Sequence, residues 1–143
     1  MIRINIAATF LACVISFLST NSVADVAVIV NPNSSVSELD DKWLGAIFLG
    51  KKKKFPDGSS AVPIEQQPGT SARDKFNEKI IKKNEGQLRG YWSQLIFTGK
   101  GRPPTAVNGS ADVKKLVSEN PAFIGYIDAS EIDDTVKVIR KLE

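Results

Sequence analysis

The sequence QQPGTSARDKF, at residues 66–76, joins a short apolar segment to an amphipathic one. Its Pro-Gly pair is a turn signal, and Thr70 or Ser71 can cap the start of a helix. Apolar residues recur at helical spacing from Phe76 onward. The stretch therefore predicts a strand, a tight turn and a helix in succession.

The start of this helix has the features of an anion-binding site. The first amides of a helix have no intrahelical partner, and the helix dipole places positive charge there. The hydroxyls of Thr70 and Ser71 and the guanidinium of Arg73 would surround the same point, an arrangement that suits a tetrahedral oxyanion such as phosphate. The candidate ligand-binding residues are Gly69, Thr70, Ser71, Ala72 and Arg73.

Arg73 supports this interpretation. A cation in the first turn of a helix is opposed by the dipole, at a cost of roughly 0.3–1 kcal/mol, and a bound anion would reverse that penalty. In the alternative interpretation, Ser71 is only a helix cap and Arg73 is an exposed residue that pairs with Glu65 or Asp74. The local pattern leaves both interpretations open.

The rest of the chain alternates between strand and helix patterns. Strands are predicted at residues 26–30, 61–64, 123–127 and 135–141, and helices at 38–48, 70–83, 87–97 and 110–119, with Ser37 and Ser110 as caps. Residues 99–104 are predicted to form an irregular loop. This alternation predicts one α/β domain in which a mostly parallel sheet is flanked by helices.

In such a sheet, ligands gather at the carboxyl ends of the strands. The strands at 26–30 and 123–127 are rich in β-branched and apolar residues, so we expect them in the centre of the sheet. The aromatic residues expected to pack against it are Trp43, Phe48, Phe76 and Trp92.

The first 24 residues are predicted to be a signal peptide, outside the folded domain. Arg3 is a short basic region, residues 4–18 are an almost uncharged apolar run, and Ser22-Val23-Ala24 has the small residues that a signal peptidase recognises. Cleavage after Ala24 would release residues 25–143 to the periplasm as a single domain. A retained membrane anchor and a lipoprotein site at Cys13 are the alternatives.

The composition argues against catalysis. The single cysteine, Cys13, lies in the predicted signal peptide, and the chain has no histidine. Residues 25–143 therefore lack the commonest general base, the usual nucleophile pairs and cysteine metal ligands. We expect no enzyme activity, no catalytic residues, no metal and no cofactor.

Four consecutive lysines, Lys51–Lys54, are the one concentration of charge. Removing Arg3 from the 19 basic residues leaves 18 against 16 acidic ones, a net charge of only +2 for residues 25–143. The lysines are either a solvated turn after a helix or a basic patch that steers anions or contacts an acidic partner. Nucleic-acid binding is not expected, because no aromatic residues interleave with the lysines and no nucleic-acid-binding signature occurs.

Several short motifs follow one another in an order that is typical of a known family. They are IFLG at 47–50, FPDG at 55–58, VPI at 62–64, GTSAR at 69–73, Trp92, FTG at 97–99, and PAFIGY at 121–126 after Val113 and Val117. Over about residues 28–127, the chain resembles the substrate-binding proteins of ABC-type phosphate transporters, in the type II periplasmic binding-protein superfamily.

The resemblance implies one lobe of a periplasmic-binding-protein-like fold. It also implies an exported solute-binding domain that recognises inorganic phosphate or a similar oxyanion and serves ABC-type phosphate uptake. Its partner would be an ABC transporter permease or another envelope protein. The alternative is an interaction or sensing module of the cell envelope that has kept the fold and lost the ligand.

The chain departs from the family pattern in two ways. Full-length members hold phosphate between two lobes, and this chain lacks their Gly-rich, hydroxyl-bearing turn after the first strand, for which Asn31–Ser35 is the candidate substitute. The family also commonly carries an arginine just before the Gly-Thr element, where this chain has Glu65, Gln66 and Gln67. Asp57 is a candidate acceptor for the proton of a bound phosphate.

Mass spectrometry of the protein isolated from its native envelope tests the predicted export. We expect Asp25 at the N-terminus, because the small residues at 22–24 direct cleavage there. An intact Met1 or a lipid-modified Cys13 would contradict a soluble periplasmic form.

Overall fold

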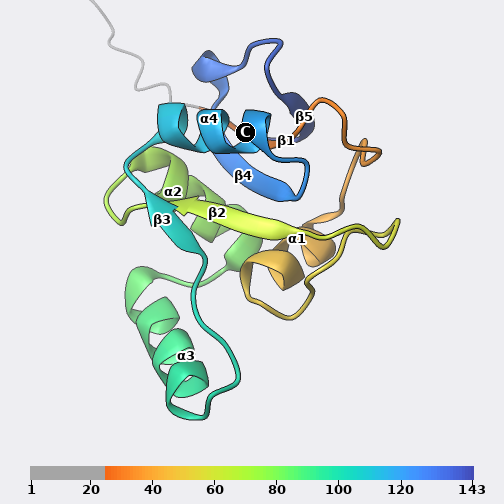
Figure 1. Ribbon diagram of the computed structural model, residues 1–143. Coiled ribbons are helices and arrows are strands. Elements are labelled where there is room, and N and C mark those ends of the chain that lie inside the picture. The colour runs from red at the N-terminus through yellow and green to blue at the C-terminus, as the bar shows by residue number, and fades with distance from the viewer. Residues whose placement is uncertain (1–24) are drawn as a thin grey trace, which may run out of the picture.

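The computed structural model describes residues 25–143, which form one five-stranded sheet with helices on both faces (Figure 1). The predicted signal peptide lies outside the described residues. The strands are β1 (Val26–Val30), β2 (Val62–Gln66), β3 (Thr105–Val107), β4 (Phe123–Asp128) and β5 (Lys137–Leu142). Their order across the sheet is β3-β2-β4-β1-β5.

Four of the five strands point in the same direction. β2 pairs in parallel with β3 and with β4, and β1 pairs antiparallel with β4 and with β5, so β1 alone runs the opposite way. The predicted α/β fold with a mostly parallel sheet is confirmed. The two strands expected in the centre, β1 and β4, are indeed interior neighbours, with Val28 opposite Tyr126.

The helices form a layer on each face of the sheet. They are α1 (Asp41–Phe48), α2 (Ser71–Phe76), α3 (Glu85–Phe97) and α4 (Ser110–Glu119); α2 continues into a π-helical turn, Asn77–Ile81. Along β1, Val26, Val28 and Val30 contact the core shared with α1, α2 and α3, whereas Ala27 and Ile29 contact the core under α4. Burial on both faces explains why β1 is apolar at every position. No helix of residues 25–143 is long and apolar enough to cross a membrane.

Several predicted boundaries are corrected by the structure. α1 begins at Asp41 rather than at residue 38, because Asp40 is the cap and its Oδ1 accepts the Trp43 amide at 2.7 Å, so Ser37 is not a cap. α3 begins two residues earlier than predicted, with a capping box between Asn84 and Gln87. The short edge strand β3 was not predicted from its three residues.

Aromatic packing holds α1 and α2 against the sheet. The Phe76 ring lies 4.6 Å from that of Phe48 and 4.3 Å from that of Tyr126, measured between centroids. Trp92 is also buried, whereas Trp43 is only partly buried and its ring lies under the Lys52 ammonium at 4.2 Å. Of the four aromatic residues predicted in the core, three are buried there and Trp43 is at its edge.

Gly125 lets α4 lie directly on β4. A Cβ at this position would be 2.4 Å from Val113 Cγ1 and 3.2 Å from the Ile64 carbonyl oxygen. The backbone of β4 therefore occupies space that any side chain would need, as the glycine inside a predicted strand indicated.

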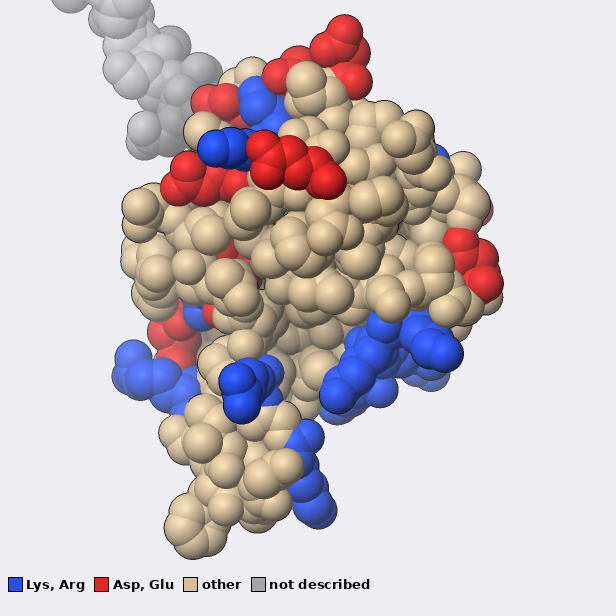
Figure 2. Space-filling model, viewed as in Figure 1, with Lys and Arg blue, Asp and Glu red and all other residues tan. Residues whose placement is uncertain are grey.

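Charged side chains are unevenly distributed over the surface. In the view of Figure 2, acidic residues gather in the upper part, whereas lysines and arginines gather in the lower part, around α1 and α3. The small net charge of the chain thus combines regions of opposite sign.

Replacing Phe76 with Ala should lower the free energy of unfolding by about 3–5 kcal/mol, because its ring is only 1% exposed and contacts two other rings. Phe97→Ala is a matched control, since Phe97 is 92% exposed and should change stability by no more than about 0.5 kcal/mol. Urea denaturation measures both values. Equal costs would show that the core is misassigned.

Candidate anion site

The turn between β2 and α2 forms as its sequence predicts. Gly69 has φ of +102°, a conformation that side chains disfavour, and this reverses the chain after Gln66. Thr70 is the cap: its Oγ1 accepts the Arg73 amide at 3.2 Å, and its carbonyl oxygen accepts the Asp74 amide at 3.1 Å. Of the two predicted caps, Thr70 takes this role and Ser71 is the first helical residue.

Two further amides at this helix start have no acceptor among residues 25–143, that of Ser71, which is exposed, and that of Ala72, which is only 1% exposed. This is usual for the first positions of a helix. Ser71 is exposed, and the Thr70 hydroxyl can still donate its proton while its oxygen caps the helix. The Arg73 amide, by contrast, is already bound by Thr70.

Arg73 does not extend into solvent. Its side chain is 7% exposed; Nε and Nη2 donate to the two carboxylate oxygens of Glu85, at 2.5 and 3.0 Å. Nη1 donates to the Gln66 carbonyl oxygen at 2.7 Å and lies 3.1 Å from Glu65 Oε1. The guanidinium thus joins the end of β2, the start of α2 and the start of α3.

The pKa values in this cluster follow from burial and pairing. Burial lowers the pKa of Arg73, but the hydrogen bond to Glu85 and the charge of Glu65 outweigh it and raise that pKa above its usual range. The hydrogen bond from Arg73 lowers the pKa of Glu85. Burial raises the pKa of Glu65, and the Arg73 charge only partly opposes this rise. Among the described residues, Arg73 is therefore the one cation paired with the carboxylates of both Glu65 and Glu85, and burial disfavours the charged form of Glu65.

This pairing corrects the predicted role of the Arg73 side chain. The guanidinium is engaged by Glu65, one of the partners in the alternative interpretation, and by Glu85, which the sequence did not indicate. A buried arginine that is bound on three sides has no open face for an anion. The amides and hydroxyls of residues 70–72 remain the candidate ligand contacts.

Polar residues that the sequence reasoning missed lie beside this turn. Gln66 donates from Nε2 to the Tyr126 carbonyl oxygen at 3.0 Å and to Ser110 Oγ at 3.2 Å. Ser110, predicted as the cap of α4, is its first residue; it accepts the Asp128 amide at 2.9 Å and donates to Asp128 Oδ2 at 3.2 Å. Asp128 directly follows a predicted buried strand, and a polar residue at the carboxyl end of a strand was the available signal.

The carboxylates outnumber the cations at this end of the sheet. Asp128 Oδ1 is buried and has no hydrogen-bond partner among the described residues. Asp25 directly precedes β1 at the same end of the sheet, and its Oδ1 lies 3.7 Å from Lys75 Nζ. Together with Glu65 and Glu85, these make four carboxylates against Arg73 and Lys75. An anion at the start of α2 would therefore be attracted by local dipoles rather than by net charge.

Asp57 and the Asn31–Ser35 turn, which the sequence suggested as further ligand contacts, lie at the other end of the sheet. Asp57 accepts hydrogen bonds from Ser35 and Ser59 in a shallow hollow beside Asn120. That hollow adjoins the end where Val30 pairs with Ile124, whereas the start of α2 lies at the end where Val26 pairs with Asp128. Neither Asp57 nor the Asn31–Ser35 turn therefore contributes to the candidate anion site.

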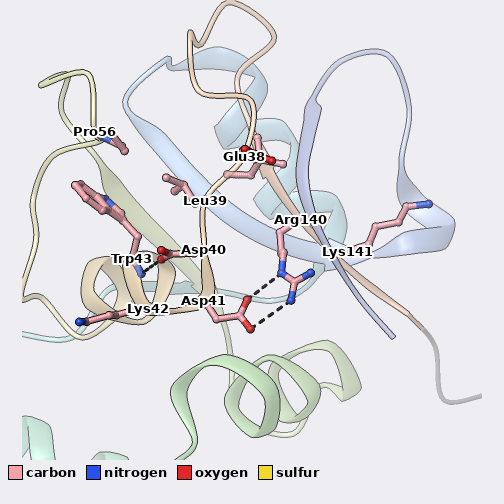
Figure 3. Close-up of a pocket in the computed structure, with 10 residues that line it drawn as sticks. Glu38, Leu39, Asp40, Asp41, Lys42, Trp43, Pro56, Arg140 and Lys141 are labelled. Carbon is pink, nitrogen blue, oxygen red and sulfur yellow. Dashed lines mark hydrogen bonds and ion pairs between the residues drawn. The ribbon is translucent and has the colours of Figure 1, made fainter.

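A large hollow among the described residues also lies away from the candidate site. It has a volume of about 980 Å³ and is lined by residues around the start of α1 and by β5, including Glu38, Trp43 and Lys141, but by none of residues 69–73 (Figure 3). Two of its charged groups already have partners within the protein, because Arg140 Nε lies 2.9 Å from Asp41 Oδ1 and Asp40 caps α1.

Replacing Arg73 with Ala should lower the free energy of unfolding by about 3–5 kcal/mol, because it leaves the buried Glu65 carboxylate unpaired. Arg140→Ala is the matched control: Arg140 also makes a two-point contact with a carboxylate, that of Asp41, but on the surface, where a pair contributes about 0–1 kcal/mol. Denaturant titration compares the two variants. Similar losses would contradict a structural role for Arg73.

No protein-family model matches the chain. Solved structures do match it. One is described as a phosphate ABC transporter substrate-binding protein from Clostridium perfringens with bound phosphate, 25% identical, with a TM-score of 0.66 over 82% of this chain and 46% of that one. Another is an ABC-type phosphate transport receptor from Vibrio cholerae, 19% identical, with a TM-score of 0.66 over 82% and 47%.

A third match is PstS from Borrelia burgdorferi, 14% identical, with a TM-score of 0.59 over 81% of this chain and 47% of that one. The chain thus spans slightly less than half the length of the solved structures it matches. Its sheet and its helices correspond to one part of those larger proteins. In fold, the chain is a single lobe that resembles the substrate-binding proteins of phosphate ABC transporters.

Proposed function

We propose that this chain is an exported solute-binding domain that recognises phosphate or a similar oxyanion. The observation that carries the proposal is the pair of unpartnered amides at Ser71 and Ala72, at the start of α2 in a fold that resembles phosphate-binding proteins. The hydroxyls of Thr70 and Ser71 would complete the contacts, and Gly69 would let the backbone approach the ligand. The ligand would then be bound by neutral donors.

Arg73 would act on this site indirectly. Its bonds to Gln66 and Glu85 fix the end of β2 relative to α2, and so fix the turn that presents the amides. Because Glu65 and Glu85 neutralise it, no free cation adds to the attraction. We therefore expect weak binding by this domain alone, with a Kd on the order of 10 μM to 1 mM, equivalent to about −7 to −4 kcal/mol.

The matching structures are about twice as long as this chain, and one of them holds phosphate. A ligand held on one side only remains partly hydrated, which weakens each polar contact. We propose that a second surface, from another copy of the chain or from another envelope protein, closes over the anion. Delivery to an ABC transporter permease would then be the biological role, in the periplasm after cleavage behind Ala24.

A second candidate function is an interaction or sensing module that no longer binds a ligand. The observation that favours it is the excess of carboxylates around the start of α2, including the unpartnered Asp128 oxygen. Such an excess opposes the approach of an anion. In this case the fold would be retained for contacts with another protein of the envelope.

Calorimetry against phosphate, sulfate and methylphosphonate tests the proposed site. It compares the unmodified protein with the variant Ser71→Pro. Ser71 is the first residue of α2, where proline is well tolerated, and Thr70 already has the extended backbone, ψ of 143°, that a following proline requires. Proline removes one amide donor, so affinity for the anion should fall by about 10- to 150-fold, as expected for a charge-assisted hydrogen bond of about 1.5–3 kcal/mol.

Ser71→Ala is the matched control. It removes the hydroxyl and keeps the amide, so it should weaken binding less than proline does. Unchanged binding by both variants would place the ligand elsewhere. No binding of any of the three anions by the unmodified protein would contradict the proposal and favour the interaction module.

A further inference from the structure

An open groove lies between the loop after α1 and the loop after α3. It has a volume of about 410 Å³, and its lining includes Lys52, Lys53, Val62, Trp92, Arg102 and Pro103. It shares no residue with the candidate anion site. We call it the basic groove, because its lining contains three cations and no acidic residue.

The floor of the basic groove is apolar. Trp92 contributes its ring, beside Ile47, Ala61 and Pro63. Gly50, with φ of +73°, brings the chain so close to this ring that an added Cβ would lie 3.4 Å from Trp92 Cη2. Val62, at the start of β2, is 41% exposed. An apolar side chain could therefore be bound here.

The three cations come from two separate loops that border the groove. Lys52 and Lys53 belong to the loop after α1, which is closed by the Lys54–Ser60 bridge, and Arg102 belongs to the loop that returns from α3. All three are exposed, and none forms an ion pair with the described residues, whereas Arg73, Lys114 and Arg140 do; the Lys52 ammonium lies over the Trp43 ring. In Figure 2, basic atoms gather below α1 and beside α3, without acidic atoms between the two groups.

The end of α3 extends this surface. Ile96 is 57% exposed, and Phe97 almost fully so. A helix rises 1.5 Å per residue, so Phe97 lies about 7.5 Å farther along the axis than Trp92. Figure 1 shows this end of α3 standing away from the sheet. Ile96 and Phe97 are thus exposed apolar residues beyond the groove, whose lining includes neither of them.

We propose that the basic groove binds an acidic, extended segment of another protein, with an apolar side chain of that segment on the groove floor. An apolar centre with a polar rim is the usual anatomy of a protein interface. A small anion is a poorer fit, because its binding groups would converge on one point, whereas these cations are exposed and come from two separate loops. Unpaired rim charges would instead steer an acidic partner and set its specificity.

Peptide display against the purified protein tests this proposal with a library of random eight-residue peptides. Peptides enriched on the unmodified protein should carry Asp or Glu on both sides of an apolar residue. The same selection on the double variant Lys53→Glu, Arg102→Glu should invert the preference to Lys and Arg around an apolar residue. Unfolding of the variant would abolish enrichment and would not invert it, so inversion reports the charges of the groove.

Lys115→Glu is the matched control, because Lys115 is an exposed residue of α4 on the other face of the sheet. It should keep the acidic preference. An enriched acidic peptide should also bind at least tenfold more weakly to Val62→Ser, which removes apolar contact from the floor. The proposal would be overturned if the enriched peptides lacked acidic residues or if the double variant enriched the same peptides. Displacement of the peptide by a single-stranded oligonucleotide of equal charge would also overturn it.

Discussion

The hydrogen-bonded ion cluster of Arg73 is the constraint on which the candidate site depends. One side chain contacts a carbonyl oxygen of β2, a carboxylate of β2 and a carboxylate of α3, while its own backbone amide is held by the cap of α2. Removing a guanidinium from water is costly, and it is tolerated only where nearly every donor finds an acceptor. Because those acceptors come from three elements, satisfying Arg73 requires all three to be in place at once.

The same cluster limits what the site can do. A cation that is satisfied by two carboxylates is not available to a ligand, so recognition has to rely on amides and hydroxyls, whose positions the cluster fixes. Such preorganised dipoles bind an anion without a net charge, and they work best when water is excluded. In the proposed site, the exclusion of water would come from the second surface that we propose to close over the anion.

The sequence correctly predicted those features of the fold that depend on residues close together along the chain. The uninterrupted apolar run of β1, the glycine of β4 and the Pro-Gly turn each gave the correct structure, because burial on two faces, close packing and a positive φ each leave a clear signature. The start of α1 was misplaced because Ser37 and Asp40 are both good caps, and only tertiary packing decides between them. The partner Glu85 and the distant position of Asp57 could not be predicted, since both depend on how separate elements meet in space.

The two proposed binding regions differ in how they attract their partners. At the start of α2 the carboxylates exceed the cations, and attraction is short-ranged, through oriented dipoles. In the basic groove the cations have no counter-charges within the described residues, and their field extends about a Debye length, roughly 8 Å at physiological salt. The small net charge of the chain thus combines two proposed recognition surfaces of different character. Because the groove and the candidate anion site share no lining residue, we propose that a partner protein bound in the groove would leave the anion site open.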